Sequence, residues 1–277
     1  MNASIFALFF LFLLSSASQA QSAFRNATAD FDKGDKLYSE ERYKEALREY
    51  QRLPVSVEAH KRIGAAQIKL WDMNAAIASL RKAVALAERD SEALALLAEA
   101  LSWKGDFDEA SALYRRSLAD KTAPVSVRLG YARTLSWSKD IDGALEQYRI
   151  ATREFPRNLD AHMGLAEMLS WKKQFDASIE SYRRVAELTD ISAYKSVALS
   201  RVGKVQTWKG DMKAAKETYQ RALRLNAKNP DAMFGLGELH EWEGNYPEAK
   251  ALYQRILQAQ PEHKAAKAKL MQLLWVK

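Results

Sequence analysis

The amino-acid sequence predicts an all-α fold, a solenoid of about seven helix–turn–helix units with a capping helix at its C-terminal end. The first observation is a small residue followed four positions later by a large apolar one, a pair that returns at steps close to 34 residues. The second is another small residue twelve positions before each pair. The third is an apolar stripe with helical spacing in each stretch, as in Leu94, Leu97, Ala98 and Leu101. Similarity at a fixed period indicates stacked units that bury their apolar faces on one another.

The pairs define the register of the seven units. They are Ala46/Tyr50, Ala76/Leu80, Ala110/Tyr114, Ala144/Tyr148, Ser178/Tyr182, Ala215/Tyr219 and Ala249/Tyr253. The small residues before them are Gly34, Gly64, Ala98, Ala132, Ala166, Gly203 and Gly237. Two steps are irregular: the first is 30 residues long, where Pro54 closes a helix early, and the fifth is 37, with three extra residues around Thr189–Tyr194.

The N-terminal segment, residues 1–20, has the features of a secretory signal peptide. Its apolar run, Ile5–Leu14, is followed by small residues, and Ser18 and Ala20 flank an expected cut before Gln21. This run is too short to span a bilayer, which needs roughly 20 residues. We expect a periplasmic protein cleaved near Ala20, with a short uncleaved anchor as the alternative. Residues 21–29 are expected to form a linker.

Composition excludes several classes of protein. The chain has no cysteine, so neither a disulfide framework nor a lipid-anchored cysteine is available. We also expect no transmembrane segment in the mature chain. The net charge of +7 comes from basic residues spread over every unit, many just after the large apolar position. This distribution favours solvated helix surface over a nucleic-acid site.

Each unit is expected to contain two helices. In the third unit these are Glu92–Lys104 and Phe107–Ala119, separated by Gly105-Asp106. Glycine is expected to end the first helix, and the acidic residue to cap the second. The same break returns at Gly210-Asp211 and Gly244-Asn245.

These residues carry a resemblance to the tetratricopeptide repeat, in which proline often stands near the end of the unit. This chain has Pro156 and Pro261 at that position. The resemblance covers residues 30–261 as seven repeats. It implies a right-handed superhelix in which the first helix of each repeat lines a concave groove. Residues 262–277 are expected to cap the array, with a helix over Lys264–Val276.

A row of tryptophans is not required by the generic repeat. Each lies seven residues before the small residue of its second helix, and three belong to the string Leu-Ser-Trp. The helical wheel places them away from the Leu97/Leu101 stripe, on one face with a charged residue four positions earlier. The predicted binding residues are Trp103, Trp137, Trp171, Trp208 and Trp242, with Glu99, Arg133, Glu167, Lys204 and Glu238. By the resemblance, this face looks into the groove.

Two ligands and one purely structural role suit this row. A peptide could set apolar side chains on the indoles while the charges orient its polar groups. An oligosaccharide could instead stack its flat faces on successive rings. Alternatively, the tryptophans could seal one unit against the next, and the alternating charges could neutralise one another. Trp71 lies outside the register and Trp275 lies in the final helix, so both are expected to be packing residues.

The sequence shows no pattern for catalysis. The four histidines (His60, His162, His240 and His263) have no metal-binding spacing, and there is no nucleophile elbow or phosphate-binding loop. We therefore expect a protein that is not an enzyme and that has no cofactor or metal.

The expected function is an exported scaffold that binds a protein or peptide in its groove as part of a bacterial envelope assembly. The chain also resembles the periplasmic repeat regions of outer-membrane and exopolysaccharide-export proteins. That resemblance implies an outer-membrane barrel or a secretion component as partner. The alternative is a glycan-binding component of exopolysaccharide secretion, for which the basic charge favours an acidic polysaccharide. A eukaryotic lumenal co-chaperone is a third hypothesis.

Overall fold

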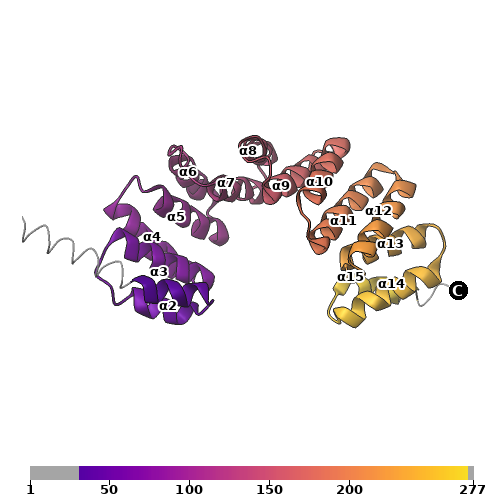
Figure 1. Cartoon of the computed structure of the whole chain (residues 1–277), viewed down its shortest axis with the longest axis horizontal. Coiled ribbons are helices and arrows are strands. Elements are labelled where there is room, and N and C mark those ends of the chain that lie inside the picture. The colour runs from indigo at the N-terminus through magenta and orange to yellow at the C-terminus, as the bar shows by residue number, and fades with distance from the viewer. Residues whose placement is uncertain (1–30, 274–277) are drawn as a thin grey trace, which may run out of the picture. The chain divides into compact units, whose positions relative to one another are not determined.

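The structure, a computed structural model, describes residues 31–273. The predicted signal peptide, the linker and Trp275 lie outside these residues. Every element within them is helical (Figure 1). Residues 31–39 form the first helix. The others are α2 (Tyr43–Tyr50), α3 (Val57–Lys69), α4 (Met73–Leu86), α5 (Ser91–Lys104), α6 (Phe107–Ser117), α7 (Val125–Trp137), α8 (Ile141–Glu154), α9 (Leu159–Trp171), α10 (Phe175–Leu188), α11 (Ser192–Lys209), α12 (Met212–Leu225), α13 (Pro230–Trp242), α14 (Tyr246–Ala259) and α15 (Lys264–Leu273).

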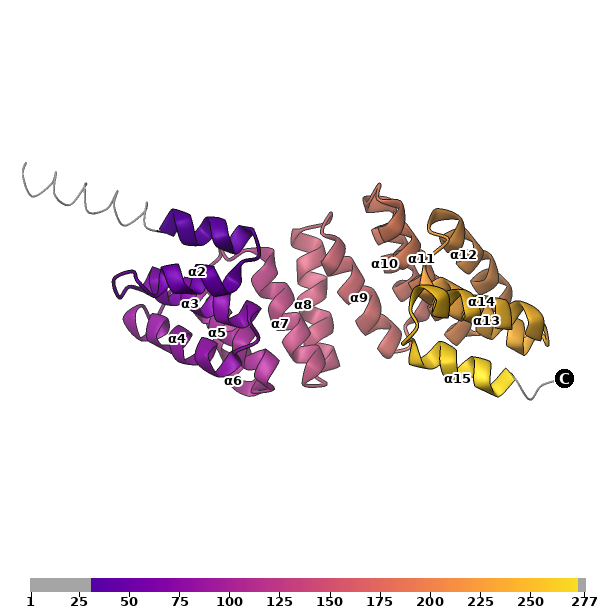
Figure 2. The same cartoon turned by 90° about the horizontal axis from the view of Figure 1, so that it is seen from below.

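The helices follow one another as helix pairs, and over the described residues seven pairs precede α15. The predicted all-α repeat architecture is thereby confirmed. The chain divides into two compact units, residues 1–130 and 131–277, with the boundary inside α7. In the first unit α3 packs against α4 and α5, and in the second α11 packs against α12 and α13 (Figure 2). The predicted helices of the third repeat are found to within two residues, since α6 ends at Ser117.

Both irregular steps appear in the helix lengths. The short first step corresponds to α2, which has only 8 residues and ends at Tyr50, before Pro54. The long fifth step ends in α11, which has 18 residues. Here a buried network links two repeats: the side-chain amide of Asn229 donates to Ser196 Oγ at 2.8 Å, and Ser196 Oγ donates to the carbonyl of Ala222 at 2.8 Å.

The core of each helix pair is a large residue set against small ones. Tyr148 is buried, and so are its counterparts in the other repeats. A Cβ on Gly203 would come within 2.8 Å of the Tyr219 ring, so the small residue allows the two helices of the pair to approach closely. The ring also meets the first helix of the next repeat, because a Cβ on Gly235 would lie only 2.2 Å from it. This second contact, sixteen residues after the tyrosine, was not predicted, although Tyr114/Gly130 and Tyr148/Gly164 repeat it.

Every turn between the two helices of a pair contains one residue with left-handed backbone. It stands five positions before the small residue of the second helix. These residues are Glu41, Trp71, Gly105, Lys139, Lys173, Gly210 and Gly244. The next residue donates its N–H to a carbonyl five residues back, as Asp106 does to Leu101 at 2.9 Å. This is the Schellman arrangement, which satisfies the last carbonyls of a helix.

The predicted helix caps are only half right. Gly105 and Gly210 end their helices with φ of 95°, as expected. Asp106, Asp211 and Asn245 do precede the second helices, but their side chains make no capping hydrogen bond. The equivalent aspartates of two other repeats do cap their helices: Ala75 N donates to Asp72 Oδ1 at 3.1 Å, and Gly143 N donates to Asp140 Oδ1 at 2.9 Å.

Between residues 31 and 273, no helix combines the length and apolar character that crossing a bilayer requires.

Candidate binding surface

The five tryptophans of the row occupy the last or next-to-last position of their helices, α5, α7, α9, α11 and α13. Their exposed fractions range from 40% to 60%. The indoles are therefore at the surface of their repeats and are not enclosed between them. Large, partly exposed aromatic residues at the same place in successive repeats mark a candidate interaction surface.

Local contacts hold the ends of these helices. In the Leu-Ser-Trp strings each serine hydroxyl donates back to its own helix, as Ser170 Oγ does to the carbonyl of Glu167 at 2.7 Å. In three of the five repeats, the residue after the tryptophan forms an ion pair with the second helix of the preceding repeat. Lys209 contacts Asp176 at 2.6 Å, and Glu243 contacts Lys216 at 2.6 Å with the charges reversed. Lys172 and Asp142 form the same link.

This line of ion pairs was missed by sequence reasoning. Its signal is present in the sequence, because an acidic residue stands second in α8 and α10 and a lysine follows the tryptophan of the next repeat. The pairs lie in solvent, so their effect on folding is small. Each pair lies next to a tryptophan and connects that end of the first helix to the preceding repeat.

Among the described residues, no ion pair joins one member of the charged row to another. Lys204 and Glu238 nevertheless attract each other, because the charge of Lys204 counters the rise in the pKa of Glu238 that burial causes. Lys204 Nζ lies 5.0 Å from the centroid of the Trp208 ring, which is a cation–π contact. Glu238 faces Lys269 of α15 at 3.7 Å. Burial raises the pKa of the Glu238 carboxyl, and Lys269 opposes that effect.

Three of the ten predicted residues meet in one pocket of about 380 Å³ between α11 and α13. Lys204 and Trp208 come from α11, and Glu238 comes from α13. The Tyr219 ring forms the floor of the pocket. It is accessible from the pocket because Gly235 has no side chain to cover it. Burial raises the pKa of Tyr219 to about 12, so this floor stays neutral.

Opposite charges face each other across the mouth of this pocket. Arg201 of α11 and Asp231 of α13 stand 3.7 Å apart, a loose pair at the limit of an ion contact. Phe234 of α13 adds an apolar wall and packs against His263 with ring centroids 6.0 Å apart. The pocket thus combines an apolar floor with two cations and two carboxylates, and its ionised groups balance. The other predicted residues lie along their own helices outside it.

The first unit has a pocket at the same place in the repeat. It has a volume of about 350 Å³ and lies against residues 31–39, α3 and α5. Asp35 holds the position that Lys204 holds in the sixth repeat, and sequence reasoning missed it because no tryptophan follows. Here an ion pair fills the space, since Arg62 Nε and Nη2 donate to Asp35 at 2.7 and 3.0 Å. Although burial opposes them, Arg62 and Tyr50 lower the pKa of Asp35.

Trp71 corrects the sequence prediction. It was expected to be a packing residue, but 68% of it is exposed. Its indole meets that of Trp103 edge to face, with ring centroids 5.2 Å apart and planes at 69°. The left-handed turn after α3 swings Trp71 out of the core and toward the first helix of the next repeat.

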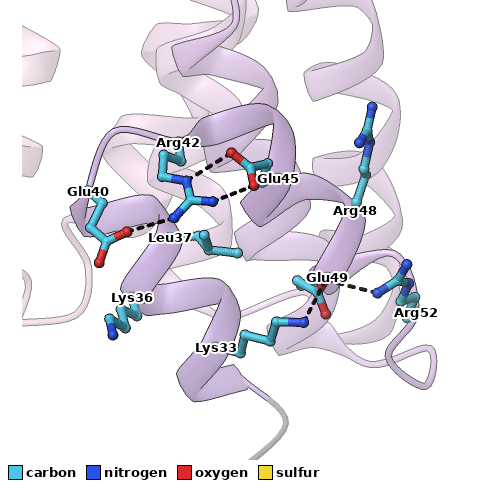
Figure 3. Close-up of a pocket in the computed structure, with 9 residues that line it drawn as sticks. All are labelled: Lys33, Lys36, Leu37, Glu40, Arg42, Glu45, Arg48, Glu49 and Arg52. Atoms are coloured by element: carbon cyan, nitrogen blue, oxygen red, sulfur yellow. Dashed lines mark hydrogen bonds and ion pairs between the residues drawn. The ribbon is translucent and has the colours of Figure 1, made fainter.

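A third hollow, of about 410 Å³, lies between residues 31–39 and α2 (Figure 3). Glu49 there contacts Lys33 at 3.1 Å and Arg52 at 2.9 Å, while Arg42 pairs with Glu40 and Glu45. Most of its charges are thus satisfied internally. Over the described part of the chain, no group of three or more metal-ligating side chains comes together.

Comparisons with known proteins agree with this architecture. The C-terminal part of a TPR repeat-containing protein from Cytophaga hutchinsonii aligns with a TM-score of 0.67 and 17% identity, over 87% of this chain and 99% of that one. A chain of the APC/C hetero-tetramer Cut9–Hcn1 aligns with a TM-score of 0.63 and 13% identity, over 90% of this chain. The present chain spans about half of that one, 48%. Pseudomonas aeruginosa pilF aligns with a TM-score of 0.61 and 15% identity, over 78% of this chain and 97% of that one.

At such low sequence identities, the similarity to these structures shows a shared fold and does not indicate a shared function or partner. A comparison with curated proteins found no match. Two family models, both described as tetratricopeptide repeat, match residues 72–126 and 209–274 and residues 138–193, which together exceed half of the chain. The chain therefore belongs to the tetratricopeptide repeat family.

Proposed function

We propose that this protein is a non-enzymatic scaffold that binds a protein or peptide partner on the tryptophan-bearing faces of its first helices. Proteins of this family are generally interaction scaffolds. The observation that carries the proposal is the pocket between α11 and α13, where the exposed Trp208 stands beside Lys204 and opposite Glu238. Aromatic anchors flanked by charged groups are the usual centres of protein interfaces.

The balance of charge in this pocket favours a peptide. Arg201 and Lys204 face Asp231 and Glu238, so the site offers donors and acceptors together. A polypeptide carries both kinds of group along its backbone and side chains, whereas an acidic polymer would meet the two carboxylates at close range. The apolar floor of Tyr219 and Phe234 would take an apolar side chain.

We further propose that the protein works in the periplasm, as part of an envelope assembly that includes an outer-membrane barrel or a secretion component. The support is the N-terminal segment 1–20, which has the apolar run and the small-residue boundary of a signal peptide. The resemblance of the Leu-Ser-Trp repeats to periplasmic repeat regions of export proteins points the same way.

The test is site-specific photo-crosslinking in the full-length protein, expressed where it normally works. A benzoylphenylalanine replaces Trp208 in one variant and Arg221, an exposed residue of α12, in the control. We expect a discrete adduct from position 208 alone, identified by mass spectrometry. The purified partner should then lose at least about tenfold in affinity with Lys204→Ala/Trp208→Ala and little with Arg221→Ala. Equal adducts at both positions would contradict the proposal.

The second candidate is glycan binding, which the repeated exposure of the indoles favours, because each ring could hold one sugar face. Intrinsic fluorescence, titrated with neutral and acidic oligosaccharides, distinguishes the two. Quenching that saturates, and that is lost in Trp137→Ala/Trp171→Ala while the fold is retained, would support the glycan. An unchanged fluorescence spectrum would rule out glycan binding and leave peptide binding as the proposed function.

A further inference from the structure

Trp71 stands where the turn between two helices favours glycine. Three of the seven equivalent positions are glycine, and Trp71 adopts the same left-handed backbone with φ of 61°. A bulky side chain in this region is a genuine outlier, because its Cβ crowds the backbone. Such outliers persist where function favours the residue despite the strain.

Nothing in the core of the repeat requires this indole. It is largely exposed and its ring contact is with Trp103, itself an exposed residue. The two rings, inclined at 69° and each partly exposed, form an aromatic corner between the turn after α3 and the end of α5. This corner extends the tryptophan row into the second repeat, at a residue outside the regular register.

The first-helix face leading to the corner is acidic. Glu92, Leu96, Glu99 and Trp103 lie on one stripe of α5, with spacings of four, three and four residues, and the first two also line the pocket of the first unit. On this face of the first unit acids outnumber bases. The acids are Asp35, Glu58, Glu92 and Glu99, and the bases are Lys61, Arg62 and Lys69.

The bases on this face are mostly occupied. Lys61 is buried and pairs with Glu92 at 2.6 Å and Glu58 at 3.0 Å, and Arg62 pairs with Asp35. Glu99, one turn before Trp103, has no ion pair with any described residue. Glu99 therefore stands near the aromatic corner without an ion-pair partner among the described residues, and Lys69 is the base of this face that also has no ion pair there.

We propose that the corner of Trp71 and Trp103, together with Glu99, receives an arginine side chain of the peptide partner, an inference that rests on the function proposed above. The planar guanidinium stacks on an indole face and donates hydrogen bonds to a carboxylate in the same plane. The protein already makes such a contact internally, where the Arg62 guanidinium lies 4.4 Å from the centroid of the Phe31 ring and donates to Asp35.

The test follows the indole N–H signals of the full-length protein by NMR, assigned with single tryptophan substitutions. The probe is a short capped peptide of alternating arginine and glycine, and its matched control carries citrulline, the neutral analogue of arginine. The arginine peptide should shift the signals of Trp71 and Trp103 in a saturable way. Trp71→Gly and Glu99→Gln should each weaken its binding by about threefold to tenfold.

The chain supplies the controls for folding. Lys139→Gly and Lys173→Gly alter the same turn position elsewhere and should leave the affinity unchanged. Glycine suits the left-handed turn, so the melting temperature of Trp71→Gly should be at or above that of the parent protein. Weaker binding in a variant of undiminished stability cannot be due to unfolding.

Two results would overturn the inference. One is an equal response of both signals to the citrulline peptide or to a neutral oligosaccharide. The other is full binding by Trp71→Gly. Failure here is distinguishable from failure of the scaffold function: a specific crosslink at position 208 without a Trp71 response removes only the arginine site, and the opposite pattern removes only the role of the α11–α13 pocket.

Discussion

The ring of Tyr148 occupies the space that a side chain on Gly164 would need. A Cβ at Gly164 would lie 2.2 Å from the ring, although the two residues belong to successive repeats. The aromatic residue of one repeat therefore holds the first helix of the next, in addition to closing its own helix pair. The stacking of successive repeats and the packing of the two helices within a repeat therefore depend on the same side chain.

This contact predicts a large cost for the smallest substitution. Gly164→Ala should reduce the free energy of unfolding by about 1–3 kcal/mol, since the buried ring has no free volume in which to move. Urea denaturation measures the loss. In the Tyr148→Leu background the same substitution should cost much less, because the shorter side chain leaves room. Equal costs in the two backgrounds would show that the ring does not set the packing.

The left-handed turns predict stabilising substitutions. Lys139→Gly and Lys173→Gly should each raise the free energy of unfolding by about 1 kcal/mol, because glycine adopts this backbone without a clash while the helices on either side are unchanged. Thermal and urea denaturation of the purified variants provide the measurement. Gly210→Ala is the reverse test, and it should destabilise although no atom lies within 4 Å of the added methyl group. A destabilised Lys139→Gly would refute this explanation.

The ion pair after Trp242 predicts a charge-swap result. Glu243→Lys should lower the melting temperature slightly, and Glu243→Lys/Lys216→Glu should restore it, because the pair has the same geometry with either polarity. Both effects should fade in high salt, where exposed charges are screened. If the melting temperature of the double variant is no higher than that of Glu243→Lys, Lys216 and Glu243 do not interact in solution.

The same pair predicts a dependence on pH. The hydrogen bond from Lys216, opposed by desolvation, lowers the pKa of Glu243 below its ordinary value of 4.5. A carboxyl whose pKa is lowered by folding stabilises the protein fully above the ordinary value. That contribution is lost as the pH falls through the lowered pKa. Melting curves of the parent protein and Glu243→Gln should therefore converge in acid and separate above about pH 5.

The N-terminal segment predicts processing on export. Expressed with residues 1–20 in a bacterial host, the protein should be recovered from the periplasm with Gln21 as its first residue, as intact mass will show. Phe10→Arg breaks the apolar run and should leave the unprocessed chain in the cytoplasm. A membrane-bound, uncleaved parent protein would favour the short anchor.

Much of the fold could be predicted because its signals repeat. The Ala144/Tyr148 pair and its equivalents placed each second helix, and Pro54 marked the shortened first repeat. The tryptophan row was visible for the same reason. What failed was local. Asp106, Asp211 and Asn245 precede their helices without capping them, and Trp71 was expected to be a packing residue because it lies outside the register.

Residue order alone established the all-helical repeat, its register and the shared face of the tryptophans, because helical periodicity is a property of neighbouring residues. Only the tertiary structure determines which of the predicted binding residues lie together in one pocket. Lys204, Trp208 and Glu238 share a pocket because Gly235 leaves the Tyr219 ring uncovered, whereas in the first repeat Arg62 fills the same space. Such contacts join residues of different repeats, and their distances depend on how side-chain volumes pack between helices, which periodicity does not specify.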